Sequence, residues 1–510
     1  MNLLLTLDRS RPEPLHTQLF EGIRRLILTG QLGSGQRLPP TRDLAQTLRI
    51  SRNTARLAYD RLAAEGYVEA RHGSATYVAV QVPDATFRAA QGPTMRGDAS
   101  DANVRVRRRA GFEAQLQDIF DDPDLAFDFA LGRPDARAFP ARVWQELIAR
   151  TLADARLRAA LTRYGDPAGF SPLREAIARH LALARGLQVN PAQVVIVSGS
   201  QEGLHLAYRL VCDPGRAVGI EDPCYQGALY LFRGLGAAVQ GVAVDTAGIC
   251  VDRLPASGFS LLYVTPSHQY PTGVTLSLDR RLALLEWAHR SDSLIVEDDY
   301  DSDFRYDGPP LTALAGLDPY QRVLYLGTFS KSIGPGLRLG YLVVPPWLAH
   351  RARTALGLMT GGRDLLGQAA LAGFLVSGRF EIHLRRLRRV YNERRQRLIA
   401  ELRRHFGSVH LTGAEAGLHL AWRLPTRWPT AEELRRIAAA AGVGLYSTRS
   451  GGAAELGEPS AHDRTVTLGF SSLAPEAIAV AINRLADALG ETGGTNAGRR
   501  VRRAAAREHG

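Results

Sequence analysis

Along the first 80 residues, apolar positions follow a helical spacing three times and then alternate twice. Thr41 and Ser51 are expected to cap two of the helices, because hydroxyl side chains accept hydrogen bonds from the first free N–H groups. Three helices followed by a hairpin is the order of a winged helix–turn–helix domain, which we assign to residues 1–80. The predicted elements are helices over residues 15–29, 42–48 and 52–65 and strands over residues 67–71 and 76–79.

The third predicted helix has an inward and an outward face. Its N-terminal residues would enter the major groove of DNA, where arginine pairs with guanine, asparagine pairs with adenine, and Ser and Thr suit phosphates. A small helical subdomain with an exposed arginine face is the alternative. The side chains expected to face inward are Leu57, Ala58, Leu62 and Ala63, and those expected to contact DNA are Ser51, Arg52, Asn53, Thr54 and Arg56.

From about residue 126 to residue 490, short β-rich apolar runs alternate with stretches of helix formers. This alternation predicts an α/β domain with a mainly parallel, buried sheet. Residues 81–125 have little periodicity and are predicted to be a linker, and residues 491–510 are predicted to be a disordered basic tail. The clearest predicted strands are residues 194–197, 261–264, 294–296 and 323–326.

Composition adds three constraints. A chain of 510 residues predicts more than one domain. The absence of a long apolar run excludes a membrane span, and three cysteines without metal or disulfide spacing favour a reducing cytoplasm and no metal site. The net charge of +12 permits nucleic-acid binding without proving it.

Lys331 is the single lysine among 63 basic residues. Arginine replaces lysine at most solvated positions but cannot act as an amine nucleophile, so a retained lysine indicates amine chemistry. The hydroxyl residues Thr328 and Ser330 flank it, and Arg338 follows seven residues later. An amine beside hydroxyls and a guanidinium suits an aldehyde that carries a phosphate.

The N-terminal residues resemble the DNA-binding domain of GntR-type regulators. The resemblance is carried by the run from Gly35 to Ala45, by Ser51-Arg52-Asn53-Thr54 and by Glu65-Gly66-Tyr67. It implies that the protein binds a double-stranded DNA operator. The residues that fall where this family contacts DNA are Arg42, Arg52, Arg56, His72 and Gly73.

The segment from Thr328 to Tyr341 resembles the lysine motif of fold-type I pyridoxal-phosphate enzymes, the aminotransferases. The resemblance implies pyridoxal 5'-phosphate bound to Lys331 as a Schiff base, and a smaller C-terminal α/β subdomain. It also implies that Tyr225 stacks on the pyridine ring, that Asp298 (with Asp299 as its rival) pairs with the ring nitrogen, and that Tyr300 bonds the ring hydroxyl. The further predicted cofactor-binding residues are Gly199, Ser200, Gln201, Thr328, Ser330, Arg338 and His268.

Two further segments extend the resemblance. The motif that begins at Tyr164 resembles one in which the tyrosine reaches the cofactor phosphate of a partner subunit, which implies a homodimer. Tyr270 precedes Pro-Thr-Gly where most aminotransferases have asparagine, a substitution typical of the MocR-type subgroup of GntR regulators. That subgroup implies a transcription regulator that senses an amine or a compound related to pyridoxal phosphate. An active aminotransferase with an accessory DNA-binding domain is the alternative.

One position departs from the aminotransferase pattern. Thr467 precedes Leu468-Gly469-Phe470, where many relatives place the arginine that binds the substrate carboxylate. Arg464 is predicted to bind the effector in its place, with Arg449 as a second possibility. This departure leans toward a regulator rather than an enzyme with full turnover. It also favours an effector other than an ordinary amino acid, such as a different amine, a sulfonate or the cofactor itself.

Overall fold

The chain divides into two compact units, Met1–Arg107 and Arg108–Gly510. The predicted linker and the predicted tail fall almost wholly outside the described residues, so both stay predictions. Within the described part of the chain, no helix has both the length and the apolar character needed to cross a bilayer. The computed structural model describes residues 5, 7–71, 75–80, 82, 125–308, 311–362, 364–457 and 463–491.

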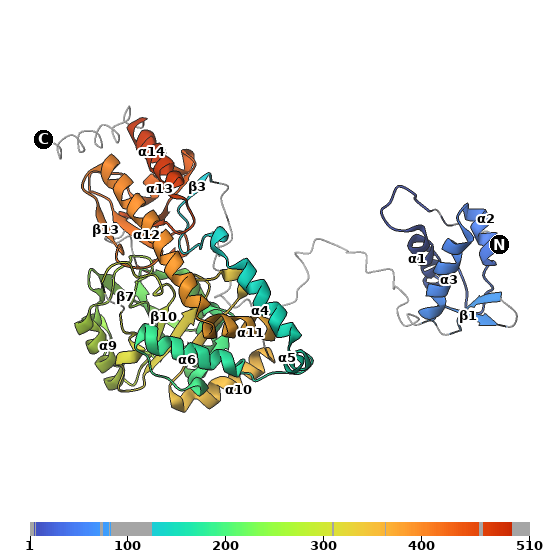
Figure 1. Ribbon diagram of the computed structural model, residues 1–510, viewed down its shortest axis with the longest axis horizontal. Coiled ribbons are helices and arrows are strands. Elements are labelled where there is room, and N and C mark those ends of the chain that lie inside the picture. The colour runs from blue at the N-terminus through green and yellow to red at the C-terminus, as the bar shows by residue number, and fades with distance from the viewer. Residues whose placement is uncertain are drawn as a thin grey trace. The chain divides into compact units, whose positions relative to one another are not determined.

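The N-terminal unit has the predicted order of three helices and a hairpin (Figure 1). Leu19, Ile23 and Leu62 are buried at its centre, and the Tyr59 hydroxyl donates a 2.8 Å hydrogen bond to the carbonyl oxygen of Pro39. Burial of these apolar side chains is the main source of stability for so small a unit. Its elements are α1 (Leu15–Leu28), α2 (Thr41–Leu48), α3 (Arg52–Ala64), β1 (Val68–Arg71) and β2 (Ala75–Val78).

Of the two predicted helix caps, one is confirmed. The backbone N–H of Thr54 donates to the Ser51 hydroxyl oxygen at 3.0 Å, so Ser51 is the N-cap of α3. Thr41 is instead the first helical residue of α2, and Pro40 occupies the N-cap position. The proline side chain has no hydrogen-bond acceptor, so α2 begins without a side-chain cap.

The predicted inward face of α3 needs correction at two positions. Leu57 is 42% exposed and Ala63 is exposed, whereas Ala55 and Tyr59 are buried together with Ala58 and Leu62. The buried residues follow the three- and four-residue spacing of one helix face, and Leu57 and Ala63 lie off that stripe. Leu57 was expected to face inward because it is apolar, but its position around the helix axis places it off the buried face.

The C-terminal unit contains an eight-stranded sheet in the order β4-β12-β11-β10-β9-β5-β7-β8. The five strands from β11 to β7 are parallel to one another, whereas β12 and β8 run antiparallel to their neighbours. The predicted mainly parallel sheet is therefore confirmed. The strands are β4 (Val194–Val197), β5 (Ala217–Asp222), β7 (Ala238–Asp245), β8 (Gly248–Ile249), β9 (Leu261–Val264), β10 (Leu294–Asp299), β11 (Val323–Thr328) and β12 (Gly340–Val343).

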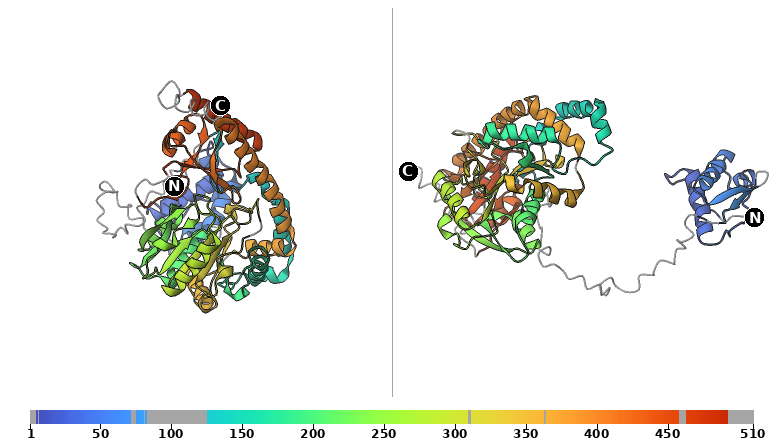
Figure 2. Two further views of the ribbon diagram at one scale, coloured as in Figure 1. Left: turned by 90° about the vertical axis from the view of Figure 1, so that its left-hand side faces the viewer. Right: turned by 90° about the horizontal axis from the view of Figure 1, so that it is seen from below.

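Helices cover both faces of this sheet, as the views of Figure 2 show. In β4, Val194 and Ile196 pack in one apolar cluster with α4, α6 and α11, while Val195 and Val197 pack in another with α7, α8 and α10. A strand buried on both faces explains the continuous apolar runs in the sequence. The helices are α4 (Ala141–Ala153), α5 (Ala155–Ala160), α6 (Ser171–Arg185), α7 (Ser200–Val211), α8 (Gln226–Gly234), α9 (Leu278–Arg290), α10 (Ala349–Thr360) and α11 (Leu365–Val376).

A smaller C-terminal subdomain is built on a four-stranded antiparallel sheet in the order β13-β14-β18-β16. The long helix α12 contacts α11 at one end and α14 of this subdomain at the other (Figure 1). The elements of this subdomain are α12 (Arg379–Phe406), β13 (His410–Thr412), β14 (His419–Arg423), α13 (Ala431–Ala440), β16 (Tyr446–Ser447), β18 (Thr465–Gly469) and α14 (Pro475–Glu491).

Two short strand pairs join distant parts of the large unit. β3 runs parallel to β15, which places the chain that follows residue 125 beside the smaller sheet. β6 pairs antiparallel with β17, which brings the residues after β5 next to the loop after β16. These pairs close the region between the two sheets, where the candidate site lies. They are β3 (Phe127–Asp128), β15 (Val443–Gly444), β6 (Cys224–Tyr225) and β17 (Ala453–Ala454).

Candidate functional site

A cavity of about 560 Å³ lies between the carboxyl ends of the parallel strands and the smaller sheet. Ligand sites in open α/β sheets typically occur at this edge. The cavity brings together residues that lie far apart in sequence, between Ala130 and Gly452, including residues of β9, β10, β11, the start of α7 and the smaller sheet. The predicted cofactor-binding residues that line it are Ser200, Gln201, Tyr225, Asp298, Tyr300, Thr328, Ser330, Lys331 and Arg338.

Lys331 follows β11 and lines this cavity. Its Nζ donates a 3.0 Å hydrogen bond to the carbonyl oxygen of Gly132. Gly132 has a φ of +63°, a conformation that glycine adopts readily, and a Cβ there would lie 2.6 Å from Nζ and displace the lysine side chain. Burial lowers the pKa of Lys331, which favours the neutral amine that a nucleophile requires.

Asp298, on β10, is the buried carboxylate of the cavity wall. The Tyr263 hydroxyl donates to its Oδ2 at 2.9 Å. Its Oδ1 is buried and has no hydrogen-bond partner among the described residues. Burial raises the pKa of Asp298 from 3.8 to about 7. A buried acceptor of this kind is costly unless a donor completes it.

Asp299, the predicted rival, lies on the other side of the strand, because successive side chains of a strand point to opposite faces. Its Oδ2 forms a 2.7 Å ion pair with Nη2 of Arg185 and accepts a hydrogen bond from the Tyr325 hydroxyl. Asp299 is therefore tied into the core beneath the sheet. Of the two carboxylates, only Asp298 lines the cavity.

A second end of the cavity combines a helix N-terminus with a guanidinium. Ser200 and Gln201 form the first turn of α7, where free N–H groups favour an anion. Gly199 precedes them with a φ of +101°, and a Cβ there would lie 3.2 Å from Nη2 of Arg338. On the same wall, the Thr328 hydroxyl donates to the Ser330 hydroxyl at 2.9 Å. This arrangement suits a phosphate group.

Aromatic side chains form the remaining wall. Gln201 donates from Nε2 to the Tyr225 hydroxyl at 3.2 Å, and Tyr225 meets Tyr270 edge to face at 5.8 Å between ring centroids. The Tyr270 hydroxyl donates to the carbonyl oxygen of Gly451 at 2.7 Å. The Tyr300 hydroxyl donates to the carbonyl oxygen of His268 at 3.0 Å. These bonds hold three phenol rings around the cavity.

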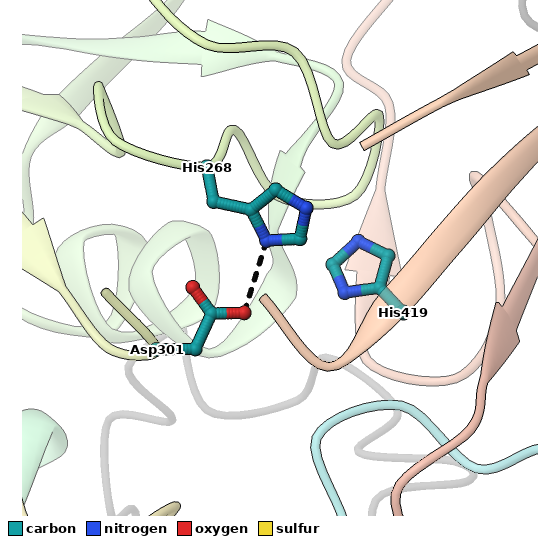
Figure 3. A group of neighbouring side chains, drawn as sticks. All are labelled: His268, Asp301 and His419. Carbon is teal, nitrogen blue, oxygen red and sulfur yellow. Dashed lines mark hydrogen bonds and ion pairs between the residues drawn. The ribbon is translucent and has the colours of Figure 1, made fainter. Parts of the chain in front are cut away.

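His268 lies behind Tyr300 and does not line the cavity itself. Its Nδ1 is 2.9 Å from Oδ2 of Asp301, and its ring centroid is 4.6 Å from that of His419 (Figure 3). The three side chains offer possible metal-ligand atoms within 4.8 Å of one another. A hydrogen-bonded histidine–aspartate pair accounts for this geometry without an ion. Burial holds the pKa of His419 well below its ordinary value, so this cavity-lining imidazole is neutral.

Three residues with predicted ligand roles lie elsewhere in this subunit. Tyr164 is 93% exposed and does not line the cavity. Arg464 donates from Nη1 to the carbonyl oxygens of Pro425 and Trp428, at 3.0 and 2.6 Å. Arg449 pairs with Glu455 at 2.7 Å. The position of Arg464 therefore corrects the predicted effector-binding role, because its guanidinium ties two loop carbonyls together outside the cavity wall.

Sequence reasoning missed several residues of the wall. Arg133, Tyr263, His419 and Tyr446 line the cavity, and none was predicted. A signal existed for Arg133, which stands in Gly132-Arg133-Pro134, a turn directly after an apolar run. Tyr263 reaches the site through the pairing of β9 with β10, and His419 and Tyr446 reach it only because the smaller sheet folds over the larger one.

The predicted DNA-contacting side chains of the N-terminal unit cluster where α2 and α3 begin. Arg42, Arg52, Asn53 and Arg56 are exposed, and Arg56 donates from Nη2 to Oδ1 of Asn53 at 3.1 Å. Ser51 and Thr54 are engaged in the cap, with their hydroxyl oxygens 2.8 Å apart. His72 and Gly73 lie outside the described residues, so their DNA contacts stay predictions.

The fold and the cavity define a protein with a helix–turn–helix DNA-binding domain and an aminotransferase-like domain. The pattern of the family described as "Aminotransferase class I and II" matches residues 132–449. The pattern of "Bacterial regulatory proteins, gntR family" matches residues 15–78. The GntR domain implies DNA binding, and the aminotransferase class I and II fold implies dependence on pyridoxal phosphate in general.

Similar proteins carry both domains. The chain is 37% identical to the probable rhizopine catabolism regulatory protein MocR of Rhizobium meliloti, over 95% of this chain and 96% of that protein. It is 34% identical to the HTH-type transcriptional regulator TauR of Rhodobacter capsulatus, over 93% and 96%. It is also 34% identical to the HTH-type pyridoxine biosynthesis transcriptional regulator PdxR of Corynebacterium glutamicum, over 82% and 85%.

Among solved structures, kynurenine aminotransferase of Pyrococcus horikoshii matches with a TM-score of 0.64 and 28% identity, over 72% of this chain and 92% of that one. The multiple substrate aminotransferase of Thermococcus profundus matches with a TM-score of 0.64 and 29% identity, over 73% and 92%. The chain therefore belongs to the MocR-type transcription regulators of the GntR family.

Proposed function

We propose that this regulator binds pyridoxal 5'-phosphate at Lys331 as a homodimer, and that an amine or pyridoxal-phosphate-related effector at this site changes its affinity for a DNA operator. The observation that carries the proposal is the position of the single lysine. Its amine is buried in a cavity together with the Asp298 carboxylate and the Arg338 guanidinium. These three groups match the aldehyde, the pyridine nitrogen and the phosphate of the cofactor.

The residues fit the cofactor in chemical detail. Oδ1 of Asp298 is a buried acceptor without a partner among the described residues, and a pyridinium N–H would complete it. Arg338 and the N-terminal turn of α7 would hold the phosphate. Tyr225 would cover a face of the ring, and Tyr300 would bond its hydroxyl. When bound, the cofactor supplies an aldehyde carbon for the Lys331 amine and an electron-withdrawing ring.

Within the chain, the surrounding groups set the proton positions. Burial lowers the pKa of the Lys331 amine and so favours its neutral form, which is the form that attacks a carbonyl carbon. The Tyr263 hydroxyl stabilises the charged form of Asp298 by donating to Oδ2, against the burial that favours the protonated form. Without the cofactor, these opposing effects leave the pKa of Asp298 at about 7.

The exposed Tyr164 supports the homodimer. It stands in the motif whose tyrosine reaches the partner's phosphate in aminotransferases, and it is 93% exposed in the single subunit. A large aromatic side chain with that exposure is suited to burial against a second copy of the chain. Regulation then requires that the effector bind two conformations of the dimer with different affinity.

The test is the visible absorption spectrum of the purified protein beside that of Lys331→Ala, before and after borohydride. A yellow wild type whose band is lost on reduction and absent from the variant supports the proposal. A colourless wild type that takes up no added pyridoxal phosphate would overturn it. Full turnover with an amino donor and a keto acid would instead favour the alternative, an active aminotransferase.

A further inference from the structure

Arg133 is a cation of the cavity wall to which the proposed cofactor assigns no role. The cations described along this wall are Lys331, Arg338 and Arg133, and the carboxylate along it is Asp298. The proposed cofactor engages Lys331, Arg338 and Asp298. Arg133 is therefore the charged side chain of the described wall that could contact an effector bound beside the cofactor.

The backbone around Arg133 is anchored on both sides. The Gly469 N–H donates to the carbonyl oxygen of Phe129 at 2.8 Å, and the Ser471 hydroxyl donates to the carbonyl oxygen of Arg133 at 2.5 Å. Two residues after Arg133, Asp135 forms an ion pair with the buried Arg394. A segment held in this way presents its side chains from a fixed position, as a binding site requires.

The side chain of Arg133 is oriented as well. Its Nη1 lies 3.1 Å from Oδ2 of Asp128, and the Tyr446 hydroxyl donates to Oδ1 of the same carboxylate at 2.6 Å. Asp128 is nearly buried, whereas the Arg133 side chain is 45% exposed. The ion pair with Asp128 helps to fix the plane of the guanidinium, and a planar guanidinium matches the geometry of a bidentate oxyanion.

The neighbouring strand carries no charge at the corresponding place. Thr467 on β18 is the direct cross-strand partner of Tyr446, so the two side chains share one face of the smaller sheet. Thr467 is fully buried, and its hydroxyl oxygen has no hydrogen-bond partner among the residues described. The cation at this part of the site therefore comes from the loop after β3 instead of from β18.

The geometry points to Arg133 as the residue that recognises an acidic group of the effector. The inferred effector is an amine with a carboxylate or a sulfonate. Its amino end would lie at Lys331 and its acidic end at Arg133, with Asp128 and Tyr446 as positioning residues. Lys331 contacts Gly132, the residue directly before Arg133, so one short segment lies beside both ends of the ligand. This inference rests on the proposed function.

The experiment measures dissociation constants by calorimetry and by changes in visible absorbance, with full-length protein saturated with pyridoxal phosphate. The acidic amines are β-alanine, 4-aminobutanoate and 2-aminoethanesulfonate, and the neutral comparison is propylamine. We expect the wild type to bind its best acidic amine at least about tenfold tighter than propylamine, as a charge-assisted contact implies. Arg133→Gln should lose this preference and bind propylamine as the wild type does.

Arg137→Gln is the matched control. Arg137 belongs to the same segment and pairs with Asp135 at 3.0 Å, but it does not line the cavity. It should keep the wild-type preference. Asp128→Asn should reduce the preference while the visible spectrum of the cofactor stays unchanged, because the guanidinium loses its orientation.

The outcomes separate the inference from the proposed function. An Arg133→Gln variant that unfolds at lower denaturant but keeps the preference for acidic amines would overturn the inference, since Arg133 would then only support the fold. The proposed function would still stand. A coloured wild type that binds neither class of amine would overturn both the inference and the proposed amine sensing.

Discussion

Tyr263 donates a 2.9 Å hydrogen bond to Oδ2 of Asp298, across the adjacent parallel strands β9 and β10. This bond leaves Oδ1 of the carboxylate without a partner among the described residues. Burial and this contact together give Asp298 an environment unlike that of Asp299, its neighbour in sequence. The difference between the two carboxylates is the basis of the first two predictions.

Asp298→Asn and Asp299→Asn should fail in different ways. Asp298→Asn should weaken pyridoxal-phosphate binding by about tenfold or more, because an amide oxygen is a weaker partner for a pyridinium. Asp299→Asn should lower the free energy of unfolding by about 3 kcal/mol, since it leaves the buried Arg185 without its counter-ion. Cofactor titration and urea unfolding distinguish the two. Equal effects of both variants on cofactor affinity would contradict the assignment.

The stability of the cofactor-free protein should depend on pH through Asp298. Burial raises its pKa from 3.8 to about 7, so between those values the folded state holds a proton that the unfolded state has lost. Its contribution to the free energy of unfolding therefore falls as pH rises through this window. Between pH 5 and pH 8, the free energy of unfolding of the wild type should fall by about 2–3 kcal/mol relative to that of Asp298→Asn, which has no carboxyl group to titrate at this position. Parallel pH profiles in urea unfolding would refute this.

Tyr164→Phe should weaken cofactor binding although the residue is exposed in the subunit. If its hydroxyl reaches the phosphate of the partner, removing it should reduce pyridoxal-phosphate affinity by about tenfold. Fluorescence or absorbance titration of the dimer measures this. Tyr320→Phe is the control, because Tyr320 bonds Glu286 on the surface. An affinity equal to that of the control would remove Tyr164 from the site.

Arg52→Ala should weaken operator binding while the cofactor spectrum stays unchanged. Arg52 is exposed at the first position of α3, and loss of a base contact costs about 1–3 kcal/mol, or roughly tenfold to hundredfold in affinity. Arg25→Ala, at an exposed position of α1, is the control. Electrophoretic mobility shifts at one fixed salt concentration measure both. Equal losses for both variants would indicate that Arg52 contributes only charge.

Arg464→Ala should affect stability and leave amine binding unchanged. Its guanidinium donates to the carbonyl oxygens of Pro425 and Trp428, which would lose their partner. We expect a loss of about 1–3 kcal/mol in urea unfolding. A loss of preference between β-alanine and propylamine in this variant would restore the effector role that the sequence suggested.

Much of the fold follows from local pattern. The helix–turn–helix order, the apolar strands β4, β9, β10 and β11 and the Ser51 cap were predicted and are confirmed, because periodicity and capping act over a few neighbouring residues. Leu57 and Ala63 were placed wrongly, because one residue of helical rotation moves a side chain off the buried face.

The sequence by itself determined the protein class and the residue types of the site. The lone Lys331, with its hydroxyl neighbours and Arg338, was visible as a motif along one short segment. Tertiary structure alone decided which carboxylate faces the cavity and which arginine lies beside the lysine. Asp298 differs from Asp299 only by the alternation of a strand, and Arg133 comes to Lys331 across almost 200 residues. Such contacts depend on how two sheets pack, which no local spacing encodes.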